Sequence, residues 1–197
     1  VGHTGLEEVV RKVVLGLWNA ASFFTLYADV NRWTPGADDL AGANVLDRWI
    51  AQRCDSVVAT VTEELERFDT ARAGKAIAEM LDDLSNWYIR RSRRRFWDGE
   101  PAALTTLHDV LHRLARLMAP FMPFVTEEVW SAIRNDGDAD SVHLADWPEV
   151  PVSQADDLLD AMALARRLVE LGRSARAAEK VKTRQPLARA LIGSTQW

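Results

Sequence analysis

The sequence predicts an all-α helix bundle followed by a short non-helical C-terminal extension. Apolar residues recur at alternating spacings of three and four along most of the 197-residue chain, and helix-capping and turn signals separate the periodic stretches. The chain shows no set of segments with alternating polarity, and 48% of its residues are hydrophobic, which suffices for a sizeable core. We expect a helical bundle over residues 1–152, and a long helix with the start of a further subdomain over residues 153–197.

The first two helices are predicted over residues 6–28 and from Asn44 or Asp47 to about residue 67. The first has a single apolar stripe, and a Thr-Pro-Gly turn at 34–36 follows it. The stripe consists of Val10, Val13, Leu17, Ala20, Phe24 and Tyr27. Asn and Asp are preferred N-cap residues, which is why either Asn44 or Asp47 can open the second helix.

Three more bundle helices follow. Asp69 or Thr70 caps the third, which spans residues 71–97 and stops at an Asp-Gly pair. The fourth spans residues 102–118 and is ended by the prolines that follow it. The fifth spans residues 125–134 and is capped by Thr126.

The remaining elements are less regular. Residues 142–151 are short and extended and are expected to lie across the bundle. A long helix over residues 154–180 carries an apolar stripe, and the short apolar segment 187–192 after Pro186 is expected to form a strand. The chain begins without a methionine and stops just after this segment starts, so we expect it to be a fragment.

Charge is sorted along the chain, although the net charge is only -5. Residues 136–160 contain eight Asp or Glu and no Lys or Arg, whereas residues 90–95 contain five arginines. A second basic run comprises Arg173, Arg176, Lys180, Lys182 and Arg184. No apolar run approaches the ~18 residues of a membrane span. The single Cys54 excludes an internal disulfide framework and a multi-cysteine zinc site, which fits a reducing, cytosolic setting.

The arginine run lies at the end of the third helix, beside aromatic residues. At 100° per residue, the stripe through Leu84 and Tyr88 continues to Arg91, Ser92 and Arg95. Arginine interleaved with flat rings is typical of a single-stranded RNA contact, because bases stack on the rings and phosphates pair with the guanidinium groups. A solvated or protein-binding basic face is the competing interpretation, to which the helix dipole contributes. Within the run we expect Arg90 and Arg93 to be solvated.

On the first helix, Asn19 and Phe23 project away from the stripe centred on Leu17. In this arrangement Asn19 could hydrogen-bond to the edge of a base while a base stacks on the Phe23 ring. A helix that is buried on both sides would show the same pattern. His108 and His112 have a zinc-binding spacing without a third acidic or cysteine ligand, so a structural role is expected and no metal site is predicted.

Six stretches resemble, in order, the region after the catalytic core in class I aminoacyl-tRNA synthetases of the isoleucine, valine, leucine and methionine group. They are VVRKVVLGLWNAASFF (9–24), LDRWI (46–50), NWYIRRSRRRFW (86–97), APFMPFVTEEVW (119–130), VHLADWPE (142–149) and RSARAAEKVKTRQPL (173–187). The third stretch and KVKTRQPL resemble the isoleucine-specific members in particular. The resemblance implies a helical anticodon-binding domain, with the valine-specific equivalent and a helical protein–protein scaffold as alternatives.

The resemblance also implies site residues. In the methionine-specific member, an Asn on the first bundle helix and a Trp closing a later helix contact the anticodon. Asn19 and Trp97 occupy the matching positions; Phe96 is a rival to Trp97, and Phe23 stands where that member has a basic residue. Helical geometry adds Tyr88, Arg91, Arg94 and Arg95 to the anticodon contacts. The second basic run, Arg173, Arg176, Lys180, Lys182 and Arg184, is expected either to contact the tRNA backbone or to be a solvated helix face.

The family's HIGH and KMSKS signatures are absent from this sequence, so the chain is expected to be non-catalytic. The implied parent enzyme is a cytoplasmic, monomeric ligase that activates isoleucine with ATP and attaches it to isoleucine tRNA, tRNA(Ile). ATP, Mg²⁺ and zinc belong to that parent, whose catalytic and editing domains are further expected partners of this chain. No cofactor and no membrane partner is expected for the chain itself.

Overall fold

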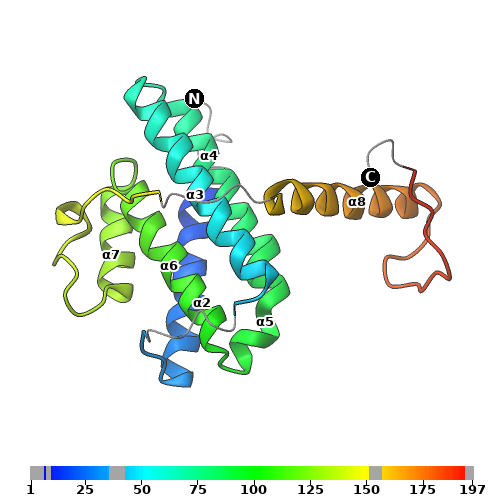
Figure 1. Cartoon of the computed structure of the whole chain (residues 1–197), viewed down its shortest axis with the longest axis horizontal. Coiled ribbons are helices and arrows are strands. Elements are labelled where there is room, and N and C mark those ends of the chain that lie inside the picture. Colours follow the sequence, from blue (N-terminus) through cyan, green and yellow to red (C-terminus); the bar gives the residue numbers. More distant parts are fainter. Residues whose placement is uncertain (1–6, 8–9, 36–42, 151–156, 194–197) are drawn as a thin grey trace. The chain divides into compact units, whose positions relative to one another are not determined.

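The computed structural model describes residues 7, 10–35, 43–150 and 157–193, and within these residues every regular element is a helix. The chain divides into two compact units, Val1–Ala155 and Asp156–Trp197 (Figure 1). The elements of the first unit, in order, are a π-helical turn η1 (Val10–Val14), α2 (Leu15–Asn31), α3 (Val45–Glu66), α4 (Thr70–Asp82), a π-helical segment η3 (Asp83–Ile89), α5 (Arg90–Trp97), α6 (Pro101–Met118), α7 (Pro123–Ile133) and a 3₁₀ turn η4 (Val142–Leu144). The second unit contains α8 (Leu158–Ala178). The predicted all-α fold class is confirmed.

Side chains at the helix starts explain where α3 and α4 begin. Asn44 and Asp47 form a capping box, in which the Asn44 side chain accepts from the Asp47 N–H and the Asp47 carboxylate accepts from the Asn44 N–H. Asp69 caps α4 by accepting from the Arg72 N–H at 3.0 Å. Two of the predicted caps, Asn44 and Asp69, are therefore confirmed.

The predicted cap at Thr126 is wrong. Helix α7 begins three residues earlier, at Pro123, where the missing N–H and the fixed φ of proline suit a first helical position. The Thr126 hydroxyl donates to the Met122 carbonyl at 2.8 Å, back along the helix. Thr126 thus lies inside α7.

The predicted helix over residues 71–97 is continuous but contains the π-helical segment η3 between α4 and α5. A π turn holds one residue more than an α turn, so every side chain that follows is displaced by about one position around the axis, roughly 100°. The apolar stripe through Leu84 and Tyr88 therefore continues to Ser92 and Phe96, both fully buried, instead of Arg91 and Arg95. This shift decides which arginines face outward.

Helix α6 is the centre of the bundle, with α2, α3, α5 and α7 packed around it (Figure 1). Its residues 102–108 are all buried, because neighbours cover it on several sides. Two tryptophans, Trp49 of α3 and Trp130 of α7, are among the largest fully buried side chains. Burial of such rings is a dominant stabilising contribution in a domain of this size.

Of the extended segment predicted over residues 142–151, residues 142–144 form the 3₁₀ turn η4 instead, and residue 151 lies outside the described residues. Residues 145–149 lie across α3 and α6, as predicted. The Trp147 indole N–H donates to the Thr62 hydroxyl of α3 at 2.8 Å. From α6, Arg116 and Arg113 donate to the carbonyls of Asp146 and Glu149, at 3.3 and 3.4 Å. The segment is therefore anchored to the bundle surface at both ends.

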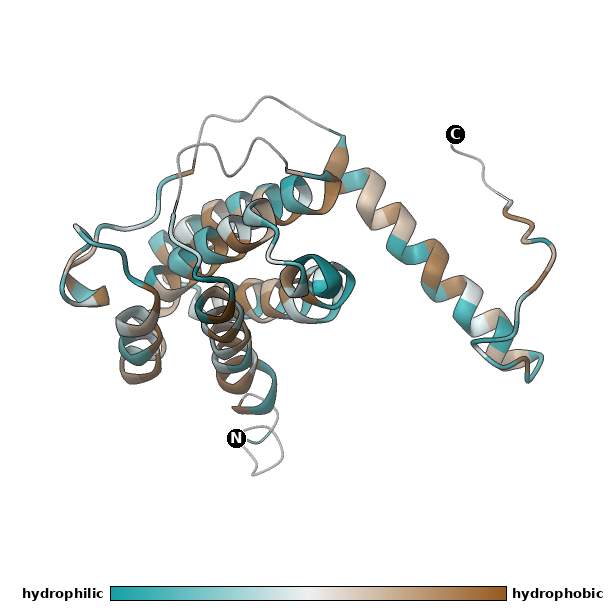
Figure 2. Ribbon diagram, turned by 90° about the horizontal axis from the view of Figure 1, so that it is seen from below, coloured by the Kyte–Doolittle hydropathy of each residue, from teal (hydrophilic) through white to brown (hydrophobic). Residues whose placement is uncertain are grey.

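The second unit consists of α8 and an irregular segment. No residue of α8 is buried, and Figure 2 shows hydrophobic and hydrophilic residues interspersed along it. Residues 186–193 have no regular backbone structure, so the strand predicted over 187–192 is not formed.

Helix α2 and the turn before it, Val10–Asn31, are long and apolar enough to cross a membrane by length and composition, with a mean hydropathy of 1.3 over 18 residues. By this test of length and mean hydropathy, the expectation that no apolar run approaches the length of a membrane span is wrong. A helix from the core of a bundle passes the same test, so one such helix is weak evidence for a membrane. One face of α2, including Leu17 and Phe24, is buried in the bundle.

His112 of α6 lies between a buried ring and a carboxylate. Its ring is 4.4 Å from that of Trp130, and its Nε2 is 3.0 Å from Asp138 Oδ2. Burial lowers the pKa of His112 below its ordinary value; the Asp138 hydrogen bond opposes this, and the charge of Arg116 adds to it. The neutral form is therefore favoured in the folded state.

A pH dependence follows from this environment. Below the unfolded pKa of about 6.5 the unfolded chain takes up a proton at His112 that the folded chain resists, so stability should fall as pH drops from about 7.5 to 5.5. His112→Gln should flatten this slope in urea titrations at a series of pH values. Equal slopes for both proteins would contradict the assignment.

Candidate nucleic-acid interface

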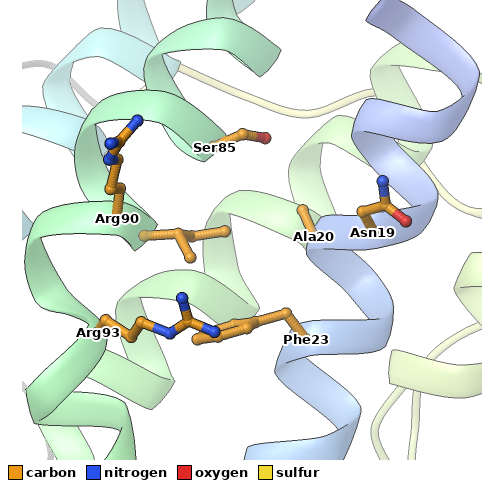
Figure 3. A pocket seen from close by; sticks show the side chains of 7 residues that line it. Asn19, Ala20, Phe23, Ser85, Arg90 and Arg93 are labelled. Atoms are coloured by element: carbon orange, nitrogen blue, oxygen red, sulfur yellow. The ribbon is translucent and has the colours of Figure 1, made fainter. Parts of the chain in front are cut away.

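A cleft of about 460 Å³ lies between α2 and the continuous helix formed by η3 and α5 (Figure 3). Both walls supply polar and apolar groups. Its lining residues are Asn19, Ala20 and Phe23 from α2, Ser85 and Ile89 from η3, and Arg90 and Arg93 from α5. The cleft thus joins the two sequence features, the outer face of the first helix and the arginine run, that pointed to RNA separately.

The aromatic wall of the cleft is held by the core. The Phe23 ring lies edge-on to Phe96 at a centroid distance of 5.1 Å and 4.6 Å from Tyr27. Phe96 in turn packs edge-on to Tyr88 at 6.0 Å. Because Phe23 rests on these rings, its position in the cleft is fixed by packing.

The opposite wall is cationic. The side chain of Arg93 extends toward Phe23 across the cleft, and Arg90 lies one turn above it (Figure 3). Both arginines are exposed, and none of the described residues supplies either with an acidic partner. Their guanidinium groups are available to an anionic ligand.

The exposed face of α5 extends this surface beyond the cleft. Trp97 ends the helix with 74% of its surface exposed, and the Arg94 side chain is 92% exposed with only a loose ion pair to Asp98, 3.5 Å. Arg91 stacks over the Trp87 ring, with its Cζ 3.6 Å from the centroid. At 100° per residue, Arg93, Trp97, Arg90 and Arg94 fall on one arc of the helix.

Arg95 points the other way, into a buried polar cluster. Its guanidinium donates to both carboxylate oxygens of Asp47, at 2.7 and 2.6 Å, and to Glu100 at 2.6 and 2.8 Å. The Tyr88 hydroxyl donates to Asp47 at 2.7 Å. Asp47, only 2% exposed, therefore joins the start of α3 to Arg95 of α5 and to Tyr88 of η3.

The electrostatics of this cluster favour a protonated Tyr88 hydroxyl and a charged Arg95 guanidinium. Burial raises the pKa of Tyr88, and the adjacent Asp47 carboxylate raises it further, so the hydroxyl stays protonated and donates. Burial opposes the charge on Arg95, but the hydrogen bonds to Glu100 and Asp47 outweigh it and raise the pKa of Arg95. The cluster is a structural tie between helices.

Three of the predicted anticodon contacts therefore need correction. Tyr88 and Phe96 are wrong because both rings are fully buried and offer no face on which a base can stack. Arg95 is wrong because it is committed to Asp47 and Glu100, with its side chain 15% exposed. Arg90 and Arg93, expected to be merely solvated, line the cleft.

The other predicted contacts remain accessible. Asn19 and Phe23 line the cleft, and Arg91, Arg94 and Trp97 are exposed on α5. Sequence reasoning missed the π-helical segment η3, which rotates the side chains of α5 by about one residue position. No residue type in the sequence indicates where such a segment occurs. In the structure, Arg90 and Arg93 line the cleft opposite Asn19 and Phe23 of α2.

The basic run of the second unit is also exposed, except for Arg176. Arg173, Lys180, Lys182 and Arg184 are solvent-exposed, whereas the Arg176 guanidinium donates to two backbone carbonyls. These residues lie in a different compact unit from the cleft.

The chemistry that the cleft offers is recognition. A carboxamide can both donate to and accept from a base edge, an aromatic ring can stack on a base, and two guanidinium groups can bind phosphate. Among the described residues no group of three or more His, Cys, Asp or Glu side chains could hold a metal ion.

Comparison with known proteins gives a consistent result. A family model described as the anticodon-binding domain of tRNA ligase matches residues 47–192. Isoleucine–tRNA ligases of Streptomyces avermitilis and Thermobifida fusca are each 52% identical over 98% of the chain, and that of Chlamydia trachomatis is 38% identical over the same share. The chain spans about 19% of the length of each of these relatives.

Proposed function

The chain belongs to the family of anticodon-binding domains of tRNA ligases, and we propose that its cleft between α2 and α5 binds the anticodon loop of tRNA(Ile). The observation that carries the proposal is the convergence of Asn19, Phe23, Arg90 and Arg93 on one cleft. In this arrangement one unstacked base enters the cleft beside Phe23, Asn19 contacts its edge, and Arg90 and Arg93 bind the flanking phosphates.

Trp97 and the outer arginines extend the proposed contact. An exposed indole at the end of α5 offers a second stacking face, and Arg94 and Arg91 lie beside it for the backbone of the loop. The described acidic residues between 136 and 160 lie outside α5, and five arginines lie within residues 90–95 of α5.

The rest of the proposal concerns the longer protein. The relatives are isoleucine–tRNA ligases, and we propose that this chain is the tRNA-binding part of such an enzyme, active in the cytoplasm as a monomer. That parent would use ATP, Mg²⁺ and zinc in other domains, including catalytic and editing domains. The names of the relatives favour isoleucine over the valine-specific alternative.

A binding titration tests the proposal. Arg93→Ala should weaken binding of transcribed tRNA(Ile) by about 1–3 kcal/mol, or roughly five- to 150-fold, because one wall of the cleft loses its cation. It should weaken binding of a tRNA whose anticodon is altered by a similar factor, because a phosphate contact carries no sequence information.

Arg48→Ala is the matched control, since it removes an exposed arginine of α3 that does not line the cleft. The two variants have the same net charge, so a general electrostatic effect would weaken both equally. Equal weakening, or equal affinity of the wild-type chain for both tRNAs, would overturn the anticodon assignment.

A further inference from the structure

The segment after α8 is a closed loop that presents three cations. Helix α8 ends at Ala178, and Lys180 then adopts a left-handed backbone conformation with φ of 54°. The Lys180 N–H donates to Ala177 and the Val181 N–H donates to Arg176, at 3.1 and 2.8 Å, which is the paired pattern of a Schellman motif. The chain therefore reverses sharply at Lys180, a conformation that glycine adopts at lower cost.

Arg176 closes the loop that this reversal begins. Its Nη1 donates to the Lys182 carbonyl at 3.1 Å and to the Gln185 carbonyl at 2.8 Å. The Gln185 N–H donates to the same Lys182 carbonyl at 2.9 Å, which makes a turn over residues 182–185. One guanidinium on the last turn of α8 thus holds two points of the loop.

The side chains of the loop point to an anionic partner. Lys180, Lys182 and Arg184 are all exposed, and no described residue forms an ion pair with any of them. Three cations within five residues repel one another, and a flexible segment would separate them. Here the hydrogen bonds from the Arg176 guanidinium to two backbone carbonyls, together with the turn at 182–185, hold the three cations on one short loop.

We propose that Arg176 is a positioning residue, which does not touch RNA but arranges Lys180, Lys182 and Arg184 as a site for consecutive phosphates of a tRNA backbone. The inference rests on the proposed tRNA-binding function and assigns this loop a role within it. It differs from the expectation that Arg176 itself either contacts the tRNA backbone or is part of a solvated helix face. A fixed spacing of cations binds a phosphate backbone at a smaller cost in conformational entropy than mobile side chains do.

The test compares Arg176→Ala with Arg173→Ala in the full 197-residue chain. Each substitution removes one arginine of α8, but only Arg176 bonds the loop. The dependence of log Kd on log salt concentration is measured for tRNA(Ile), and a lost phosphate contact lowers its slope by about one. Arg173→Ala should lower the slope by at most about one, and Arg176→Ala by about two or more because the loop cations lose their arrangement.

A double-variant cycle supplies the second readout. Lys182→Ala should lower the slope by about one in the wild-type chain and have little effect in the Arg176→Ala background. The same loss in both backgrounds, or equal slopes for Arg176→Ala and Arg173→Ala, would overturn the positioning role. If the wild-type chain fails to bind tRNA at low salt, the proposed function itself fails, which is a distinguishable result.

Discussion

Asp47→Ala should lower the free energy of unfolding by about 3–5 kcal/mol, the cost of removing one partner from a buried ion pair. Asp47 accepts hydrogen bonds from Arg95, from the Tyr88 hydroxyl and from the Asn44 N–H. Its loss leaves the partly buried guanidinium of Arg95 with Glu100 as its remaining counter-ion and removes half of the α3 capping box. Urea denaturation followed by circular dichroism measures the change.

Glu128→Ala is the control for this prediction. Glu128 is an exposed carboxylate on α7 with no hydrogen bond or ion pair to any described residue, so its removal should change stability by no more than about 0.5 kcal/mol. If Asp47→Ala were as stable as Glu128→Ala, the cluster would not be the tie between α3 and α5 that the geometry indicates.

Trp97→Ala should weaken tRNA binding by about 1–3 kcal/mol, roughly five- to 150-fold, the loss associated with one base–aromatic stack. Trp97 is 74% exposed at the end of α5, so its ring has little contact with the core and the variant should unfold at nearly the wild-type urea concentration. The affinity and the unfolding midpoint are measured on the same preparations.

Phe124→Ala is a matched control, because Phe124 is an exposed aromatic of α7 with 86% of its surface accessible. It should leave tRNA affinity unchanged within about twofold, which corresponds to roughly 0.4 kcal/mol. A loss of affinity equal to that of Trp97→Ala would indicate a non-specific effect of surface aromatics. That result would contradict the proposal that a base stacks on Trp97.

The sequence predicted the helices well because their signals are local. The Asn44 and Asp69 caps precede periodic apolar runs, and both open helices as expected. The predicted cap at Thr126 is wrong because a proline is compatible with two positions, just after the end of one helix or at the start of the next. Pro123 is the first residue of α7. Local signals of this kind do not require knowledge of what packs against the helix.

The site was predicted only in part, and the errors lie on one side of one helix. Asn19, Phe23 and Trp97 came from the outer face of the first helix and from the family resemblance, and all three are accessible. Tyr88 and Arg95 came from extending an α-helical stripe, which the π segment at Asp83–Ile89 displaces by one residue. Phe96 came from the family resemblance, as a rival to Trp97, and its ring is buried.

The sequence by itself determined the all-α class, most helix boundaries, the concentration of arginine beside aromatic residues and the family. Only the tertiary structure decided which arginines are free. Asp47 lies 48 residues before Arg95, yet its carboxylate is 2.6 Å from that guanidinium, and Phe23 packs on Phe96 from another helix. Tertiary packing decides whether a helix contains a π segment and which side chains of distant helices form ion pairs. An arginine that forms a buried ion pair therefore cannot be distinguished in the sequence from one that is available to bind a ligand.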